Sequence, residues 1–117
     1  FVFPSAYETF SMVSYEAAAA GLPVIASELY GVEEFLNDGY NGWLIERTAN
    51  KLAEKLDYVL QNRSMLEEMG QNAIESVQRY SIKIFGERWR AYYKSISSGE
   101  ILSNAQIQNI PSEVGNR

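Results

Sequence analysis

Residues 1–27, FVFPSAYETFSMVSYEAAAAGLPVIAS, contain the pattern that decides the fold. The opening FVF is short and continuously apolar, which is typical of a strand buried in a parallel sheet. Residues 12–20 favour a helix that stops at Gly21, and residues 24–26 indicate a second buried strand that Pro23 can open. A strand, a helix and a second strand in this order predict a parallel α/β arrangement with a right-handed crossover.

The rest of the chain extends this pattern and then becomes helical. A short helical turn is expected around residues 33–36, and the turn signals at 38–39 and 41–42 precede a third strand at 43–45. From Asn50 onward, apolar residues recur at helical spacing in three successive segments. The expected fold class is therefore α/β, with a partial Rossmann-like parallel sheet of about three strands and covering helices.

Capping signals mark the expected start of three helices. Thr9 or Ser11 is placed to cap the first helix. Ser64 and Glu67 form a capping-box pattern, and Ser81 precedes the last helix.

The chain is long enough for one domain and closes on a polar stretch. A folded chain of 117 residues buries about two-thirds of the surface that its unfolded form exposes. We predict a folded part over residues 1–97 and a disordered polar tail over residues 98–117, where no sustained period appears. A three-stranded sheet is thin, and the chain opens inside an apolar run without Met. We therefore expect a piece of a longer protein, with a sheet edge open to self-association.

Composition excludes several classes of function. Without Cys or His the chain has no disulfide or thiolate metal site and lacks the commonest general base. The net charge of −5 argues against nucleic-acid binding. No apolar run is long enough to cross a bilayer, and we expect a cytoplasmic protein with no bound metal or other cofactor.

Two carboxylates, Glu8 and Glu16, lie on either side of the expected start of the first helix. The loop after a parallel strand is where ligands of such sheets bind, and a helix N-terminus favours an anion such as a diphosphate. Each carboxylate can accept hydrogen bonds from the paired hydroxyls of a sugar or a ribose. The spacing therefore suits a nucleotide-sugar. The alternative is that Glu16 is a solvated helix residue and that Glu8 only interacts with the helix dipole.

The motifs PSAYETFSMVSYEAAAAGLPVIAS and GVEEFLNDGYNGWLI resemble the C-terminal domain of the retaining, nucleotide-sugar-dependent glycosyltransferases of family 4, which have the GT-B fold. The family's E-x7-E motif is read here as Glu8-TFSMVSY-Glu16. The small-residue helix, the GLPVIAS strand, the glycine-containing loop and the DG-x-NG turn follow in the family's order. The resemblance is strong over residues 1–46 and loose beyond them. It implies that the chain is the C-terminal half of a GT-B donor domain.

The resemblance implies a role for each matched position. Glu8 is implied as the catalytic carboxylate, which lies against the donor sugar. The donor-binding set offers backbone N–H groups to the sugar and the diphosphate, and Glu16 binds the ribose hydroxyls. That set comprises Thr9, Phe10, Ser11, Met12 and Glu16. The family commonly has Gly where Thr9 and Ser11 stand, so these side chains are expected to narrow the loop.

The resemblance also implies what this segment lacks. The family's Arg and Lys that complete the diphosphate clamp lie earlier in the domain, and no Lys or Arg precedes Arg47 here. The acceptor-binding N-terminal domain and the base-binding loop are absent as well. The expected activity is sugar transfer from a nucleotide-diphosphate sugar, with the isolated chain inactive. Two alternatives stay open: a non-catalytic nucleotide-binding or assembly module of the same fold, and a nucleotide-sugar epimerase.

We interpret the aromatic residues and the basic residues of the last helix as structural, in preference to a role in ligand binding. We expect Trp43 and the stripe from Phe85 to Tyr92 to serve core or interdomain packing. In the family the last helix crosses back to the other domain. The modest basic patch of Arg88, Arg90 and Lys94 is interpreted as a solvated helix face, with a peripheral membrane contact as the alternative.

Overall fold

The computed structural model describes residues 1–110, which divide into two compact units. The first unit spans Phe1–Gln78, and the second begins at Arg79. We describe each unit separately.

The first unit is built on a three-stranded parallel sheet. The strands are β1 (Val2–Phe3), β2 (Val24–Ser27) and β3 (Gly42–Ile45), in the order β1-β2-β3. Val2 pairs with Ile25, and Ile25 pairs with Trp43, so one register runs across the sheet. The expected fold class is confirmed, and the three strands lie where the apolar runs predicted them.

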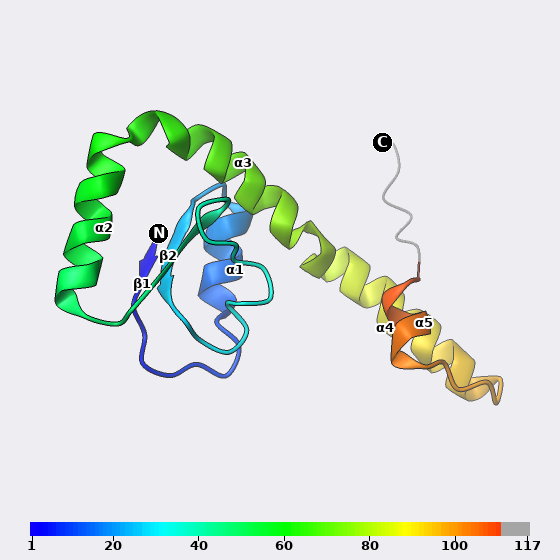
Figure 1. Ribbon diagram of the computed structural model, residues 1–117. Coiled ribbons are helices and arrows are strands. Elements are labelled where there is room, and N and C mark those ends of the chain that lie inside the picture. The colour runs from blue at the N-terminus through cyan, green and yellow to red at the C-terminus, as the bar shows by residue number, and fades with distance from the viewer. Residues whose placement is uncertain (111–117) are drawn as a thin grey trace. The chain divides into compact units, whose positions relative to one another are not determined.

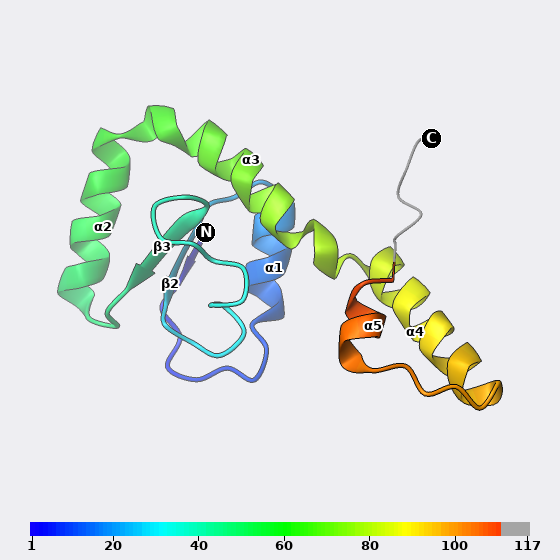
Figure 2. The same ribbon diagram turned by 45° about the vertical axis from the view of Figure 1, so that its right-hand side comes forward.

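Helices cover both faces of this sheet. Helix α1 (Met12–Ala19) lies on one side and α2 (Ala49–Gln61) on the other, as Figures 1 and 2 show. Helix α3 (Leu66–Val77) follows a 3-10 turn at Arg63–Met65 and packs along α1. Two covered faces explain why every residue of β2 is buried and why the sequence of that strand shows no alternation.

The core on the α2 side forms around side chains that share one face of the sheet. Successive strand residues point to opposite faces, so Ile25, Trp43 and Ile45 face α2 together. Trp43 is 4% exposed, as expected for a core residue, and Lys55 Nζ lies 5.5 Å from its ring centroid. The remaining members of this core come from α2, α3 and the turn between them: Leu52, Val59, Met65, Leu66 and Met69.

The connection from β2 to β3 is a set of turns held by a buried asparagine. The short helical turn expected at 33–36 is present as hydrogen-bonded turns, in which the Leu36 N–H donates to Val32 O at 3.0 Å. Asn41 is fully buried. Its Oδ1 accepts from the backbone N–H of Asn37 at 2.7 Å, and its Nδ2 donates to Phe35 O and to Ser76 Oγ, both at 2.7 Å. Because Ser76 lies on α3, Asn41 ties the turns to a helix 35 residues away.

Helices α1 and α3 approach each other at a glycine contact. A Cβ built on Gly70 would lie 2.3 Å from the backbone oxygen of Gly21, which is too close for any side chain. Gly21 itself ends α1 with φ +79°, in the left-handed region that glycine adopts without strain. The close contact therefore requires glycine at position 70, and the backbone conformation favours glycine at position 21.

The helix starts agree only partly with the capping signals. Ser81 Oγ accepts from the Ile84 N–H, as predicted, and Thr48 caps α2 by accepting from Lys51. The capping box at Ser64 and Glu67 is wrong: Ser64 lies inside the 3-10 turn, and Met65 is the N-cap of α3 without a side-chain bond. The 3-10 turn moves the helix start two residues beyond Ser64.

The second unit consists mainly of α4 (Ile82–Ser97) and the short α5 (Asn104–Gln108), preceded by a 3-10 turn at Gln78–Tyr80. Helix α5 lies beside α4 (Figures 1 and 2), and Arg88 Nη2 donates to Gln108 O at 3.1 Å. Ser103 and Gln106 form a capping box at the start of α5. This helix falls within the stretch expected to be a disordered tail, and residues 111–117 of that stretch lie outside the described residues.

Candidate functional site

The six predicted site residues lie in one continuous stretch, the loop after β1 and the first two turns of α1. Glu8 is half-buried in the loop, and Glu16 is exposed on the second turn of the helix. Neither carboxylate has a hydrogen-bond or ion-pair partner within residues 1–110. Both side chains are therefore available to a ligand.

The start of α1 presents unpaired backbone donors. Within the described part of the chain, the N–H groups of Met12 and Val13 have no acceptor. The first N–H groups of a helix carry the positive end of its dipole, so an anion bound here gains about 0.3–1 kcal/mol. This end of α1 can therefore hold a phosphoryl group between the two glutamates.

Ser11 occupies the N-cap of α1, but its hydroxyl does not cap the helix. Ser11 Oγ and Ser14 Oγ are 2.7 Å apart, and both residues are buried. The expectation of a side-chain cap from Thr9 or Ser11 is therefore wrong, because the two serine hydroxyls bind each other. Turned inward, the Ser11 side chain does not cover the N–H groups that follow it.

The glycine-containing loop after β2 packs against this same stretch. Gly31, at φ +88°, lies beside Phe10, and an added Cβ would make an ordinary contact of 3.5 Å with Phe10 Cα. Tyr15 Oη donates to Gly31 O at 2.7 Å, and the Tyr15 ring stacks on Phe10 with centroids 5.0 Å apart. Tyr15 thus fixes the loop beside the start of α1.

A second group of polar residues lies at the carboxyl ends of all three strands, and the sequence analysis did not select it. Ser27 Oγ donates to Ser5 O at 2.6 Å, which joins the end of β2 to the loop after β1. An open hollow of about 420 Å³ adjoins this bond, with Glu28, Glu46 and Arg47 among its lining residues. Only position could have pointed to this hollow in the sequence, because its polar residues lie just after the predicted strands.

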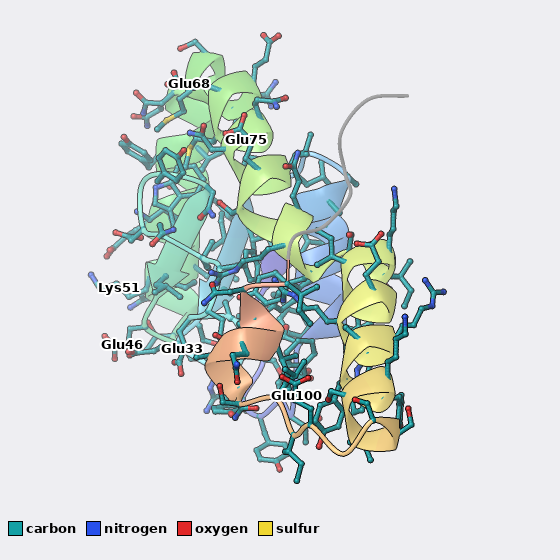
Figure 3. The ribbon with its side chains drawn as sticks, turned by 90° about the vertical axis from the view of Figure 1, so that its right-hand side faces the viewer. Glu33, Glu46, Lys51, Glu68, Glu75 and Glu100 are labelled. Carbon is teal, nitrogen blue, oxygen red and sulfur yellow. The ribbon has the colours of Figure 1, made fainter. Side chains whose placement is uncertain are left out.

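The cations of the first unit all come from Arg47 or later in the sequence. Arg47 lines the hollow. Lys51, labelled with Glu46 in Figure 3, binds Glu54 at 2.8 Å; that hydrogen bond, more than the nearby charges of Glu54 and Glu46, raises the pKa of Lys51. No Lys or Arg precedes Arg47 in the sequence. The loop after β1 and the start of α1 thus contribute backbone donors and no cation of their own.

Residues 1–110 contain no group of three or more His, Cys, Asp or Glu side chains placed to hold a metal ion. No helix among these residues is both long and apolar enough to span a bilayer.

Comparison with known sequences identifies relatives over most of the chain. The family model described as "Glycosyl transferases group 1" matches residues 1–76. The chain is 38% identical over 81 residues to an uncharacterized glycosyltransferase of Methanocaldococcus jannaschii, covering 68% of this chain and 23% of that protein. It is 32% identical over 97 residues to the capsular polysaccharide biosynthesis glycosyltransferase CapM of Staphylococcus aureus, covering 81% and 26%.

Comparison with solved structures gives the same result. A sucrose-phosphate synthase from Thermosynechococcus elongatus superposes with a TM-score of 0.78 at 30% identity, over 85% of this chain and 25% of that chain. The crystal structure of TarM superposes with a TM-score of 0.64 at 32% identity, over 74% and 18%. The chain thus spans about a quarter or less of each of these relatives.

Proposed function

The chain belongs to the group 1 glycosyl transferases, and from this membership we propose that it forms the donor-binding part of an enzyme that moves a sugar from a nucleotide-diphosphate sugar to an acceptor. One observation carries the proposal: two unpartnered carboxylates, Glu8 and Glu16, lie on either side of the free N–H groups that begin α1.

The diphosphate of the donor binds at the start of α1. The N–H groups of Met12 and Val13 are its donors, together with the backbone around Thr9, Phe10 and Ser11. The charge of the diphosphate grows as the sugar leaves, so contacts at a helix N-terminus strengthen during the reaction.

Glu8 lies on the sugar side of the diphosphate in this arrangement. A carboxylate accepts hydrogen bonds from sugar hydroxyls, and its negative charge stabilises an oxocarbenium-like transition state. We assign Glu8 the catalytic role on that basis, in a reaction that retains the anomeric configuration.

Glu16, one turn further along α1, accepts hydrogen bonds from the two ribose hydroxyls of the nucleotide. Its exposure on the helix surface leaves its carboxylate open to such a pair. Hydrogen bonds to a charged acceptor contribute about 1.5–3 kcal/mol each, so Glu16 matters for any nucleotide, with or without its sugar.

The chain by itself is proposed to be inactive, because residues 1–46 offer no cation to the diphosphate. The purified chain is incubated with UDP-glucose and sugar acceptors. The rate of transfer to the acceptor should not exceed the rate of donor hydrolysis. Robust transfer would refute this part of the proposal.

Amide NMR titration tests the two roles separately. The wild-type chain is titrated with UDP-glucose, GDP-mannose and free UDP, and shifts are expected within residues 9–16. Glu16→Ala should weaken the binding of UDP-glucose and of UDP alike, by at least about tenfold in Kd. Glu8→Ala should weaken the binding of UDP-glucose and leave the affinity for UDP unchanged, because free UDP has no sugar for Glu8 to contact.

Glu67→Ala is the matched control, since Glu67 is also exposed on a helix and should change neither affinity. If the chemical shift changes are the same in Glu16→Ala as in the wild type, the assignment of Glu16 to the ribose is refuted. An equal loss for UDP and UDP-glucose in Glu8→Ala would refute the sugar assignment. If both variants bind every nucleotide like the wild type, the alternative of a non-catalytic module is favoured.

A further inference from the structure

Asn41 and Gly42 form the only Asn-Gly pair in the sequence. An Asn side chain loses its amide most readily before Gly, because a residue without a Cβ leaves its backbone nitrogen open to attack the neighbouring side-chain carbonyl. The pair lies where the turns after β2 enter strand β3. In an unfolded chain it is therefore reactive, and in the folded chain its fate depends on the contacts around it.

Gly42 cannot be replaced in the folded chain. A Cβ at this position would collide with the backbone oxygen of Val24, its partner on the neighbouring strand. The backbone of the Asn-Gly pair is held on both sides: Gly42 O accepts from the Gly39 N–H at 2.8 Å, and Asn41 O accepts from the Val24 N–H at 3.4 Å. The sheet therefore fixes the orientation of this backbone.

The amide of Asn41 is equally constrained. Its Oδ1 accepts from a backbone N–H, and its Nδ2 donates to Phe35 O and Ser76 Oγ, with all three bonds at 2.7 Å. Attack by the Gly42 nitrogen requires Asn41 Cγ to swing toward the backbone, which breaks these bonds. The side chain is also fully buried, away from the water that the reaction consumes. The folded state thus blocks a reaction that the sequence favours.

The bonds around Asn41 extend to α3, so its exposure involves that helix. Ser76 Oγ, which accepts from Asn41, donates to Asn72 O at 2.7 Å, and Asn72 Nδ2 donates to Tyr40 O at 3.0 Å. These bonds form a closed circuit from the turns to the helix and back. Asn41 is therefore exposed when the turns separate from α3, which is a local opening of the unit.

We propose that Asn41 is a deamidation site that reacts only when the turns after β2 open. The Gly42 nitrogen then bonds to Asn41 Cγ, and the bond from Cγ to Nδ2 breaks. The proton of the Gly42 N–H passes through solvent to Nδ2, which leaves as ammonia. One water molecule then opens the succinimide ring at either carbonyl, giving an aspartyl or an isoaspartyl linkage at position 41. This inference does not depend on the sugar-transfer proposal.

Either product hinders the turns from closing again. A carboxylate only accepts hydrogen bonds, so Phe35 O loses its donor and faces a negative charge instead. A buried charge without a partner is strongly unfavourable. The isoaspartyl linkage also adds a methylene to the backbone before β3, which displaces Gly42 from its pairing with Val24. A reversible opening thus becomes a lasting loss of stability.

Peptide mass spectrometry of the full chain, aged at neutral pH in buffer and in concentrated urea, measures the reaction. Deamidation raises the mass, whereas isomerisation at the exposed Asp38, which also precedes Gly, leaves the mass unchanged. Unfolding equilibrium constants of small domains are about 10³–10⁸. Allowing for local opening, Asn41 should react at least about 100-fold more slowly in buffer than in urea.

Two comparisons in urea test the chemistry without any need for folding. Asn104, which precedes Ala, should deamidate more slowly than Asn41 in the same sample. Gly42→Ala should slow the reaction at Asn41 in the same way, because the added Cβ hinders attack by the backbone nitrogen.

Two serine variants test whether the fold controls the rate. Ser76→Ala removes one acceptor of the Asn41 amide, and it should speed deamidation in buffer by about tenfold without changing the rate in urea. If circular dichroism shows that Ser76→Ala is unfolded in buffer, its rate there should equal its rate in urea. Ser64→Ala, at an exposed position of the 3-10 turn, is the matched control and should react like the wild type in both solvents.

A second measurement tests whether the modified chain has lost stability. Chains aged in urea are returned to buffer, and the fraction deamidated at Asn41 should unfold at a lower urea concentration than the unmodified fraction. Asn41→Asp tests the aspartyl product alone and should change the midpoint in the same direction.

Any of four results would overturn the proposal: equal rates at Asn41 in buffer and urea, equal rates for Asn41 and Asn104 in urea, equal rates for Ser76→Ala and Ser64→Ala in buffer, or a deamidated fraction that keeps the unfolding midpoint of the wild type.

Discussion

Asn41→Ala should be the most destabilising polar substitution in the first unit. It removes three hydrogen bonds of 2.7 Å from a fully buried side chain. At about 1 kcal/mol net for each bond, the expected loss in the free energy of unfolding is about 3 kcal/mol. For a unit of 78 residues this corresponds to a fall in Tm of roughly 12–24 °C.

Thermal unfolding followed by circular dichroism measures this loss. Asn37→Ala is the matched control, because the Asn37 side chain is exposed and makes one bond of 3.4 Å, to Phe35 O. The control should change the free energy of unfolding by less than about 1 kcal/mol. Similar losses in the two variants would refute the reasoning that the buried amide of Asn41 holds the turns to α3.

Three further substitutions test separate parts of the structure. Gly70→Ala should cost about 1–3 kcal/mol in the free energy of unfolding because its Cβ would meet backbone. The control Gly86→Ala, whose Cβ would have nothing within 4 Å, should be neutral or stabilising. Equal effects of the two in urea denaturation would contradict the close helix contact. Tyr15→Phe should speed amide hydrogen exchange in the loop after β2, and unchanged exchange would show that the Tyr15 hydroxyl does not hold that loop. Thr48→Ala should lower the free energy of unfolding by about 1 kcal/mol, and Ser64→Ala should leave it almost unchanged, a difference that thermal unfolding measures. The reverse order would support the capping box at Ser64.

Local patterns predicted the elements of the sheet correctly, because the information is contained in short stretches. The apolar runs at 1–3 and 24–26 and the turn signals before Trp43 each lie within a few residues of the strand they predict. Helix α1 was predicted to within one residue for the same reason.

Features that depend on distant parts of the chain were missed. The turns after β2 are held by Asn41 through Ser76 and by Tyr15 through its bond to Gly31, and neither partner is visible in the local pattern. The hollow at the carboxyl ends of the strands requires the register of three strands, so Ser27 and Arg47 did not stand out among ordinary loop residues.

The candidate site lies between these two cases. The spacing of Glu8 and Glu16 was evident from the sequence, and so was their position around a helix start. The inward turn of Ser11 toward Ser14 was not, because the choice between capping and pairing depends on the burial of both hydroxyls.

The placement of the two tryptophans has a consequence for how unfolding is observed. Trp43 is buried in the first unit, and Trp89 is partly exposed in the second, so the two units carry separate fluorophores in different environments. A buried indole emits at shorter wavelength than a hydrated one, and the two contributions to the spectrum can be followed independently during denaturation. If the units lose structure at different denaturant concentrations, the short- and long-wavelength edges will give two midpoints. The stability of this chain is then described by two free energies, one for each tryptophan.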